Sequence, residues 1–161
     1  MKVGDFLDPE AIVVHIKATS KREVLEELVD ALVSVHRQFD RERMVEALVE
    51  RERLGSTGIG DGVAIPHGKL DGLDRLIACF GKSERGVEFQ SMDKKSAHLF
   101  FLLFAPENSA GSHLKALALI SRLLKRPSLR EELLRAQSRE KIYEILTRED
   151  EQERHAPEPH S

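Results

Sequence analysis

Apolar residues recur at three- and four-residue steps in several stretches of the chain, and this spacing predicts amphipathic helices. Over residues 20–36 the apolar positions fall on one face, and Ser20 and Glu23 have the spacing of a capping box. Over residues 40–54, Asp40 is a candidate N-cap. Three further helices are predicted over residues 112–125, 128–136 and 138–148, with Ser128 and Ser138 as candidate caps of the last two.

Shorter apolar runs between these helices predict β-strands. Residues 97–105 are apolar at nearly every position, as in a central strand that is buried on both faces. Residues 63–65 and 73–81 are also strand-like, and residues 86–89 predict a short strand or an extended loop. Because helices and strands are interspersed, we expect an α/β sandwich in which helices cover a small sheet. The order of the strands does not follow from the pattern.

From Glu149 the periodicity ends, and the remaining residues are polar and include two prolines. This composition predicts a disordered tail over residues 149–161. The rest, residues 1–148, has the length of one domain with its own hydrophobic core.

Composition narrows the classes of function. The 25 Lys and Arg residues are outnumbered by 28 Asp and Glu residues, and the net charge is −3. Nucleic-acid binding needs a strongly basic face, so we expect no nucleic-acid partner. Seven histidines show no pair at the i, i+4 spacing of a helical zinc site, and there is one cysteine. We therefore expect neither a metal nor another cofactor.

Sorting signals are also missing from the pattern. The N-terminal residues lack the continuous apolar stretch of a signal peptide, and the longest apolar run, Leu99–Ala105, is too short to span a bilayer. The single cysteine, Cys79, lies in an apolar run and is interpreted as a buried core thiol. We expect a cytoplasmic protein without membrane insertion.

The stretch GSTGIGDGVAIPHGK, residues 55–69, contains five of the chain's 10 glycines. It does not match a P-loop, because five residues instead of four separate Gly62 from Gly68 and Lys69 is followed by leucine. The dinucleotide-binding fingerprint fails as well, because the third glycine of Gly58–Gly62 comes one residue early. Nucleotide binding is therefore not expected.

His67 stands out within this stretch. Pro66 stiffens the backbone before it, and Gly68 after it carries no side chain that could obstruct the ring. Imidazole has its neutral, nucleophilic form available near neutral pH, so this frame suits a ring nitrogen that is offered to another molecule. The alternative is a turn histidine whose ring caps the end of a strand. The residues alone leave both interpretations open.

The same string closely resembles the active-site signature of the enzyme IIA domains of the bacterial phosphoenolpyruvate-dependent phosphotransferase system (PTS), in the fructose and mannitol class. It is most similar to the nitrogen-regulatory branch, EIIA-Ntr. The flanking segments MVEALVERERLGSTGIG and HLKALALISRLLKRPSLREELLRAQSREKIYEIL resemble that family too, so that the resemblance covers residues 5–148. It implies the mannitol-IIA-like fold, a mixed five-stranded sheet flanked by helices.

The resemblance also implies a set of site residues. His67 corresponds to the histidine that carries a phosphoryl group, and family analogy implies its Nε2 atom. His113 corresponds to a second histidine that hydrogen-bonds near that group. Arg51 corresponds to an arginine of the site, with Arg53 as the neighbouring alternative. A guanidinium suits phosphoryl transfer because charge develops on the equatorial oxygens in the transition state.

Other residues near the motif are secondary candidates. Ser56, Thr57 and Gly68 belong to the glycine-rich string, and Lys69 is either a contributor to the site or a solvated surface lysine. Ile59 and Phe104 could belong to a docking ring for partners, although core packing is the favoured interpretation of both.

By resemblance, the chain is a phosphocarrier with a covalent phosphohistidine, a transferase component supplied by an HPr-type or NPr-type protein. In one hypothesis it is regulatory, and phosphorylation changes which target proteins it binds. In a second it passes the group to a fructose- or mannitol-type EIIB for sugar uptake. The glycine string and the absence of a fused IIB, IIC or HPr module favour regulation. A third, a binding module that has lost phosphorylation, is disfavoured by the joint presence of His67, His113 and Arg51.

Overall fold

The computed structural model describes the backbone of residues 1–155 and the side chains of residues 1–150. A mixed sheet forms its centre and has the order β1-β5-β6-β3-β2, with β4 also paired to β6. The strands are β1 (Leu7–Val13), β2 (Gly58–Gly60), β3 (Val63–Ala64), β4 (His67–Leu70), β5 (Ile77–Val87) and β6 (Ala97–Pro106).

The sheet is five strands wide although six strands are assigned. Both β3 and β4 run parallel to β6, β3 beside Leu99 and Phe100 and β4 beside residues 103–106. They therefore lie end to end along one edge of β6, separated by Ile65 and Pro66. The other edge of β6 pairs antiparallel with β5, which pairs parallel with β1. The predicted mixed sheet of about five strands is confirmed.

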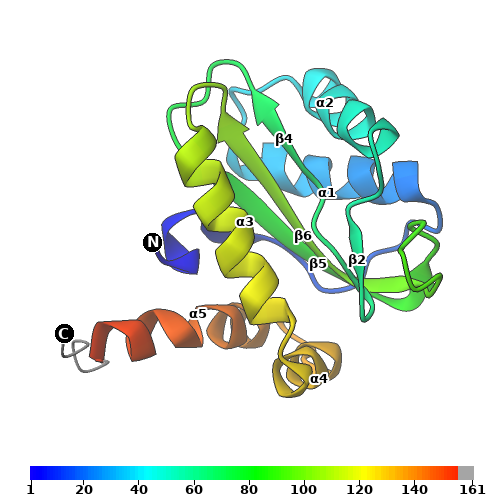
Figure 1. Ribbon diagram of the computed structural model, residues 1–161, viewed down its shortest axis with the longest axis vertical. Coiled ribbons are helices and arrows are strands. Elements are labelled where there is room, and N and C mark those ends of the chain that lie inside the picture. Colours follow the sequence, from blue (N-terminus) through cyan, green and yellow to red (C-terminus); the bar gives the residue numbers. More distant parts are fainter. Residues whose placement is uncertain (156–161) are drawn as a thin grey trace.

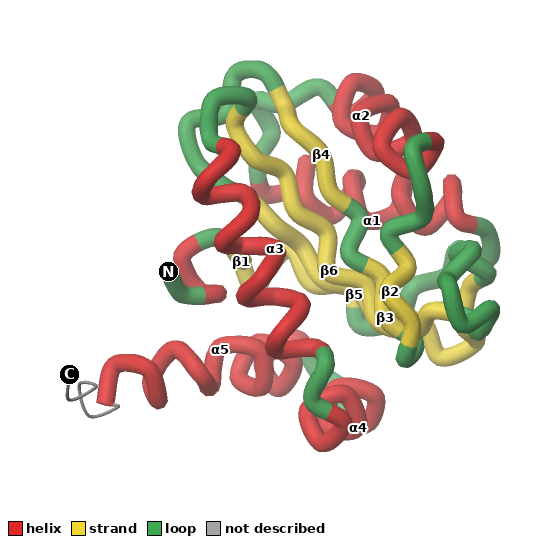
Figure 2. Tube along the Cα trace, in the orientation of Figure 1, coloured by secondary structure: helices red, strands yellow, loops and turns green. Residues whose placement is uncertain are grey.

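Helices cover both faces of this sheet, as the sequence predicted. They are α1 (Lys21–Val35), α2 (Arg41–Arg53), α3 (Ala110–Leu124), α4 (Pro127–Arg135) and α5 (Arg139–His155), and a short 3-10 helix, η1 (Val3–Asp5), precedes β1. Figure 1 shows α3 in front of the sheet and α1 behind it, and Figure 2 shows the same layers by element type. The core is correspondingly divided into a layer under α1 and α2 and a layer under α3, α4 and α5.

The apolar run of β6 contributes side chains to both layers of the hydrophobic core. Phe100 and Phe104 pack in the layer beneath α1 and α2, whereas Phe101 and Leu103 pack in the layer beneath α3, α4 and α5. Alternation along a strand sends successive side chains to opposite faces, so a central strand that is covered on both sides must be apolar throughout. Phe104 is fully buried, which confirms core packing for this residue.

Three predicted helix caps are confirmed. Ser20 accepts a hydrogen bond from Glu23 N, Asp40 caps α2, and Ser138 Oγ accepts one from Lys141 N at 3.1 Å. The predicted start of α4 is wrong. Ser128 does not cap it, because the helix begins at Pro127, a residue that has no N–H group to satisfy at this position.

The strand predictions need three corrections. The strand expected over residues 73–81 begins only at Ile77 and continues to Val87, because the chain is still turning after Gly72, whose φ is +86°. β1 was not predicted, since it contains Pro9 and its register with β5 shifts between Leu7 and Ile12, so that no clean alternation appears. β2 and β4 are too short to produce a pattern.

The predicted tail also needs correction. α5 does not end at residue 148 but continues to His155. Within this continuation the Asp150 carboxylate accepts hydrogen bonds from Val3 N at 2.9 Å and Gly4 N at 3.0 Å. Asp150 therefore belongs to the domain, and the boundary at residue 148 was placed too early. The remainder of the predicted tail, residues 156–161, lies outside the described residues.

A buried lysine fastens α4 to the sheet. Lys82, on β5, is fully buried, and its ammonium group donates to the carbonyl groups of Leu134 and Ala136 at the end of α4. Burial lowers the pKa of Lys82 from its ordinary value. A cation is favoured at a helix C-terminus, where carbonyl groups lack partners within the helix.

Within residues 1–155, none of the helices is long and apolar enough to cross a membrane.

Candidate functional site

His67 is the first residue of β4, and its backbone lies beside Leu103 of β6. The two rings of His67 and His113 meet edge to face, with their centroids 5.5 Å apart and an interplanar angle of 77°. His113 lies in the first turn of α3, so the His67 side chain projects from the sheet towards α3. Residues that are 46 positions apart in the sequence therefore form one site.

Hydrogen bonds fix the tautomer of the His67 ring. Its Nδ1 atom lies 2.7 Å from the carbonyl oxygen of Ile65. A carbonyl oxygen can only accept, so Nδ1 carries the proton. Arg51 Nε–H donates to His67 Nε2 at 3.3 Å, which requires a lone pair on Nε2. Both contacts assign the nucleophilic lone pair to Nε2.

The environment also keeps the ring neutral. Burial is the largest effect and lowers the pKa of His67 from its ordinary value of 6.5. The hydrogen bond to the Ile65 carbonyl opposes this shift, and the positive charge of Arg51 adds to it. A neutral imidazole with a free Nε2 is the form that can attack an electrophile at pH 7.

Arg51 lies in the last turn of α2 and has a second contact. Its Nη1 atom donates to Gly55 O at 2.8 Å, so the guanidinium joins the end of the helix to the imidazole. Arg53 is exposed and pairs with Glu50. The structure therefore brings Arg51 to the site and leaves Arg53 outside it.

His113 presents a polar atom without a partner. The side chain is 8% exposed, and its Nε2 atom is buried with no hydrogen-bond partner among the described residues. Burial lowers the pKa of His113, and the charges of His67 and Lys69 lower it further. An unpaired buried polar atom costs about 1–3 kcal/mol, so its presence beside His67 points to a group that it binds in another state.

The N-terminus of α3 is open beside these two rings. Ser109, the N-cap residue, offers no side-chain cap to the helix, because its hydroxyl donates to Pro106 O at 2.7 Å. Helix N-termini attract anions through unpaired N–H groups and the helix dipole. Arg51, His113 and this helix end thus surround His67 with donors for an anionic group.

A family model described as "Phosphoenolpyruvate-dependent sugar phosphotransferase system, EIIA 2" matches residues 5–149. The chain belongs to this PTS EIIA type-2 family. The match covers the whole site, from α2 through the glycine-rich stretch to α3, and it agrees with the resemblance that the motif predicted.

Individual relatives of this EIIA domain include proteins from both branches. A nitrogen regulatory protein of Bradyrhizobium diazoefficiens is 40% identical over 146 residues, which cover 91% of this chain and 95% of the relative. The fructose-specific EIIABC component of Bacillus subtilis is 37% identical over 150 residues, which cover 93% of this chain and 24% of that protein. The crystal structure of nitrogen regulatory protein IIA-Ntr from Neisseria meningitidis has a TM-score of 0.84 at 34% identity and covers 90% of this chain and 99% of that one.

Of the secondary candidates of the EIIA domain, Ser56, Thr57 and Gly68 lie around the site rather than in it, whereas the charge of Lys69 lowers the pKa of His113. Ser56 donates to Phe89 O, and Thr57 donates to the Glu52 carboxylate, so both anchor the loop before β2. A side chain at Gly68 would point at Ala47 of α2, 3.6 Å away, on the sheet face opposite His67. The expectation that Gly68 clears space for the ring is therefore wrong. Lys69 is exposed.

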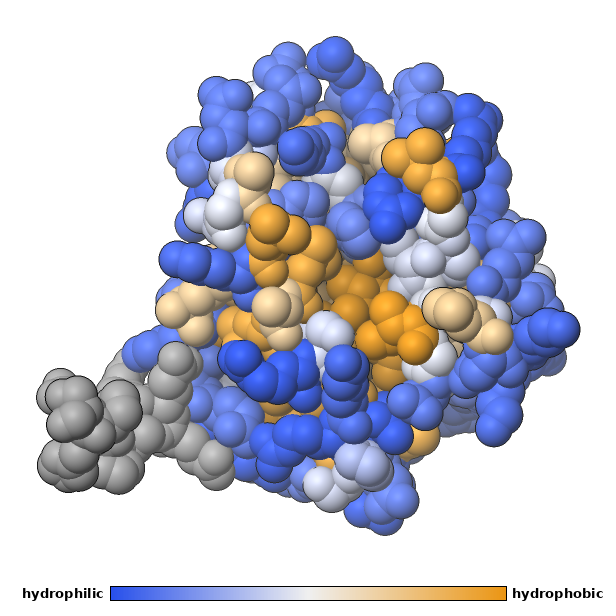
Figure 3. All heavy atoms as spheres, viewed as in Figure 1, coloured by the Kyte–Doolittle hydropathy of each residue, from blue (hydrophilic) through white to orange (hydrophobic). Residues whose placement is uncertain are grey.

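Exposed apolar side chains flank the site of the EIIA domain. We call Leu54, Ile59 and Leu114 the apolar rim; they are 85%, 44% and 69% exposed. Leu54 follows α2, Ile59 lies on β2 and Leu114 follows His113. Figure 3 shows apolar side chains on the face where α3 and β2 lie, next to strongly hydrophilic ones. Core packing was the wrong interpretation for Ile59, because β2 is at the edge of the sheet.

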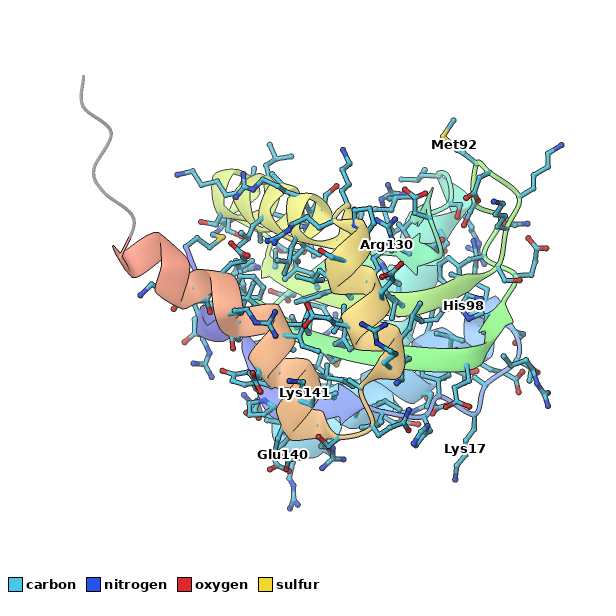
Figure 4. All side chains as sticks on the ribbon, turned by 90° about the horizontal axis from the view of Figure 1, so that it is seen from below. Lys17, Met92, His98, Arg130, Glu140 and Lys141 are labelled. Atoms are coloured by element: carbon cyan, nitrogen blue, oxygen red, sulfur yellow. The ribbon has the colours of Figure 1, made fainter. Side chains whose placement is uncertain are left out.

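His98 has a structural role outside the site. His98, near the start of β6, has its Nδ1 atom 2.9 Å from Ser83 O, and Figure 4 shows it where the β5–β6 hairpin turns. Met92, also labelled in Figure 4, projects outward from the loop between these strands and is 94% exposed. Within residues 1–150, no group of three or more His, Cys, Asp and Glu side chains could hold a metal ion.

Stability of the EIIA domain should fall in mild acid. The pKa values of His36, His67 and His113 are all lowered, with burial as the largest cause. The unfolded chain therefore binds more protons once the pH falls below about 6.5, and the free energy of unfolding decreases from there towards the folded-state pKa values. We expect a lower urea midpoint at pH 5 than at pH 7.5. His113→Gln should weaken this dependence, and equal midpoints at both pH values would contradict it.

Proposed function

We propose that this EIIA domain accepts a phosphoryl group on Nε2 of His67 from an HPr-type or NPr-type phosphohistidine protein. The observation that carries the proposal is the hydrogen bond between His67 Nδ1–H and the Ile65 carbonyl, which leaves Nε2 as the free nucleophile. In the transfer, the N–P bond of the donor breaks, its nitrogen recovers the electron pair, and a new N–P bond forms at His67 Nε2. The Nδ1 proton stays on Nδ1, where it is hydrogen-bonded to the Ile65 carbonyl.

The surrounding donors have separate tasks in this reaction. Arg51 donates to Nε2 in the unphosphorylated state, and its guanidinium is free to turn to the phosphoryl oxygens once Nε2 is bonded to phosphorus. His113 Nε2 gains the hydrogen-bond partner that it lacks, and the N-terminus of α3 faces the negative charge. Phosphoryl transfer depends mainly on such positioning and charge stabilisation.

The apolar rim supports a protein as the donor. A small phosphate ester would need an enclosed pocket, whereas exposed apolar side chains beside a reactive group are typical of a protein interface. Leu54, Ile59 and Leu114 surround the site from three different elements, so a partner can bury them while its phosphohistidine reaches His67.

For the use of the phosphoryl group after its acceptance, we propose the regulatory role. The relative at 40% identity, of which the chain covers 95%, is a nitrogen regulatory protein, and this similarity supports the proposal. The fructose-specific relative is an EIIABC component of which the chain covers 24%, and it supports the second candidate, transfer to an EIIB. In the regulatory role, the phosphoryl group changes which target proteins the apolar rim binds.

A reconstituted transfer reaction tests both the acceptor atom on His67 and the choice between regulation and sugar transport. The protein is incubated with phosphoenolpyruvate, enzyme I and either HPr or NPr, and the phosphohistidine isomer is identified by ³¹P and ¹⁵N NMR. We expect an acid-labile, alkali-stable group on Nε2 of His67, with His15→Ala as an exposed control that labels normally. An Nδ1 isomer or an acid-stable label would contradict the mechanism. A fructose-type EIIB added afterwards should discharge the label slowly, and rapid discharge would favour sugar transport.

A further inference from the structure

Two contacts set the tautomer of His67: Arg51 donates to Nε2, and the acceptor of the Nδ1 proton is a backbone group, the carbonyl of Ile65. What holds that carbonyl in place therefore contributes to keeping the lone pair on Nε2. Ile65 lies between β3 and β4, outside both strands, and its N–H donates to Thr57 O at 3.0 Å. The position of residue 65 is thus tied to the loop that precedes β2.

Thr57 is in turn held by one carboxylate. Glu52 Oε1 accepts a hydrogen bond from Thr57 N at 3.1 Å, and Glu52 Oε2 accepts one from the Thr57 hydroxyl. Thr57 is 4% exposed, so water does not compete effectively for these bonds. Two contacts to one residue restrain both its backbone and its side chain.

The Glu52 carboxylate is buried and paired. Its side chain is 6% exposed, and Lys21 Nζ of α1 lies 2.9 Å from Oε1. Lys21 also donates to Gln90 Oε1 at 3.2 Å, and its ammonium lies 4.7 Å from the centroid of the Phe89 ring. A buried ion pair of this kind costs desolvation energy and is retained where its geometry is needed, since removing one partner leaves an unpaired charge.

We propose that Glu52 is a positioning residue for the phosphoryl acceptor. Through Thr57 and the backbone of Ile65 it holds His67 in the tautomer whose Nε2 carries the lone pair. The neighbouring residue, Arg51, contacts the ring directly and also binds Gly55 O in the same loop. The last turn of α2 therefore sets both the charge beside the imidazole and the orientation of the ring. The role of Glu52 in phosphoryl transfer rests on the proposed function, whereas its effect on the tautomer of His67 does not.

Loosening this chain of hydrogen bonds has a chemical consequence. When residue 65 shifts, Nδ1–H loses its acceptor, and the proton is free to move to Nε2. The ring then has no lone pair at the atom that attacks phosphorus. Acceptance of the phosphoryl group should fall in proportion to the fraction of this wrong tautomer, without any change at His67, Arg51 or His113.

The test uses three variants and a matched control. Thr57→Val keeps the shape of the side chain and removes its donor, Glu52→Ala removes the whole anchor, and Glu52→Gln keeps hydrogen-bonding capacity without charge. Glu50→Ala is the control, because Glu50 lies on the same helix, is exposed and pairs only with Arg53 among the described residues. The tautomer of His67 is read from ¹⁵N NMR of the imidazole in the unphosphorylated protein.

We expect the Nδ1–H form in the wild type and in Glu50→Ala, and a mixture with the Nε2–H form in Thr57→Val and Glu52→Ala. The rate of phosphoryl acceptance should fall about tenfold in Glu52→Ala, the size found for partners that orient a reactive group, and Glu52→Gln should recover part of it. A folded Thr57→Val protein with the wild-type tautomer would overturn the proposal. If the wild type accepts no phosphoryl group, the proposed function fails. The tautomer measured in the unphosphorylated variants then still shows whether Glu52 positions the His67 ring.

Discussion

His67→Ala should abolish the acid-labile phosphoryl label completely. Among the residues whose side chains the structure describes, Nε2 of His67 is the only imidazole nitrogen with both a lone pair and an adjacent arginine, so we expect no substitute nucleophile. The expected rate of transfer from the HPr-type donor is zero within the sensitivity of a radiolabelled assay. The fold should survive, because His67 is the first residue of β4 and is only partly buried.

His113→Ala should separate acceptance of the phosphoryl group from its later transfer. It leaves Nε2 of His67 in place and removes the neighbouring ring with its unpartnered Nε2 atom, so the label should still form but should be transferred or hydrolysed at a changed rate. A label that persists in His67→Ala would disprove the assignment of the acceptor. Transfer that is unchanged in both directions in His113→Ala would remove His113 from the mechanism.

Arg51→Ala should reduce the rate of phosphoryl acceptance by about 100-fold, the effect of deleting one charge-stabilising donor from a preorganised site. The variant removes the Nε contact to His67 and the Nη1 contact to Gly55 O together. Arg51→Lys should recover only part of the rate, because an ammonium group cannot replace a planar fork that binds two acceptors at fixed angles. Rates are measured by single-turnover transfer from the phosphorylated donor.

Arg53→Ala provides the matched control for Arg51. It lies two positions further along the same helix, is exposed and pairs with Glu50, so its removal should change the rate less than twofold. Equal losses in the two variants would mean that the general positive charge of this surface matters, and not the guanidinium beside His67.

Helices were predictable from the sequence because local rules determine them. The stripes of α1 and α2 and the caps Ser20, Asp40 and Ser138 all act within one or two turns. The strands were predictable only where burial imposes a pattern, as in β6. β1 is held by long-range pairing with β5 and contains Pro9, so its own residues do not indicate a strand.

One missed element did carry a signal. Asp61 and Gly62 connect β2 and β3, with φ values of +56° and +76°. An Asp-Gly pair with both φ values positive is the preferred two-residue hairpin turn, and Asp93 supports it by accepting a hydrogen bond from Asp61 N at 3.0 Å. The glycines at this point therefore shape a hairpin and not a nucleotide-binding loop.

The site was predictable in part. Resemblance to a family identified His67, His113 and Arg51, and the structure brings them together. The residues that orient His67 could not be found in this way, because Ile65 acts through its carbonyl and any residue type provides one. Glu52 is one of many glutamates on the helices, and only its burial against Thr57 and Lys21 distinguishes it.

The contact between Asp150 and the first residues has a consequence for synthesis on the ribosome. The acceptor of Val3 N lies 147 positions later in the chain, and Arg139 Nε donates to Ile12 O at 3.0 Å. Among the described strands, β1 pairs with β5 alone, and β5 is also synthesised later. Residues 3–12 are therefore synthesised well before the residues of α5 that they contact, and this part of the nascent domain cannot close until α5 has emerged.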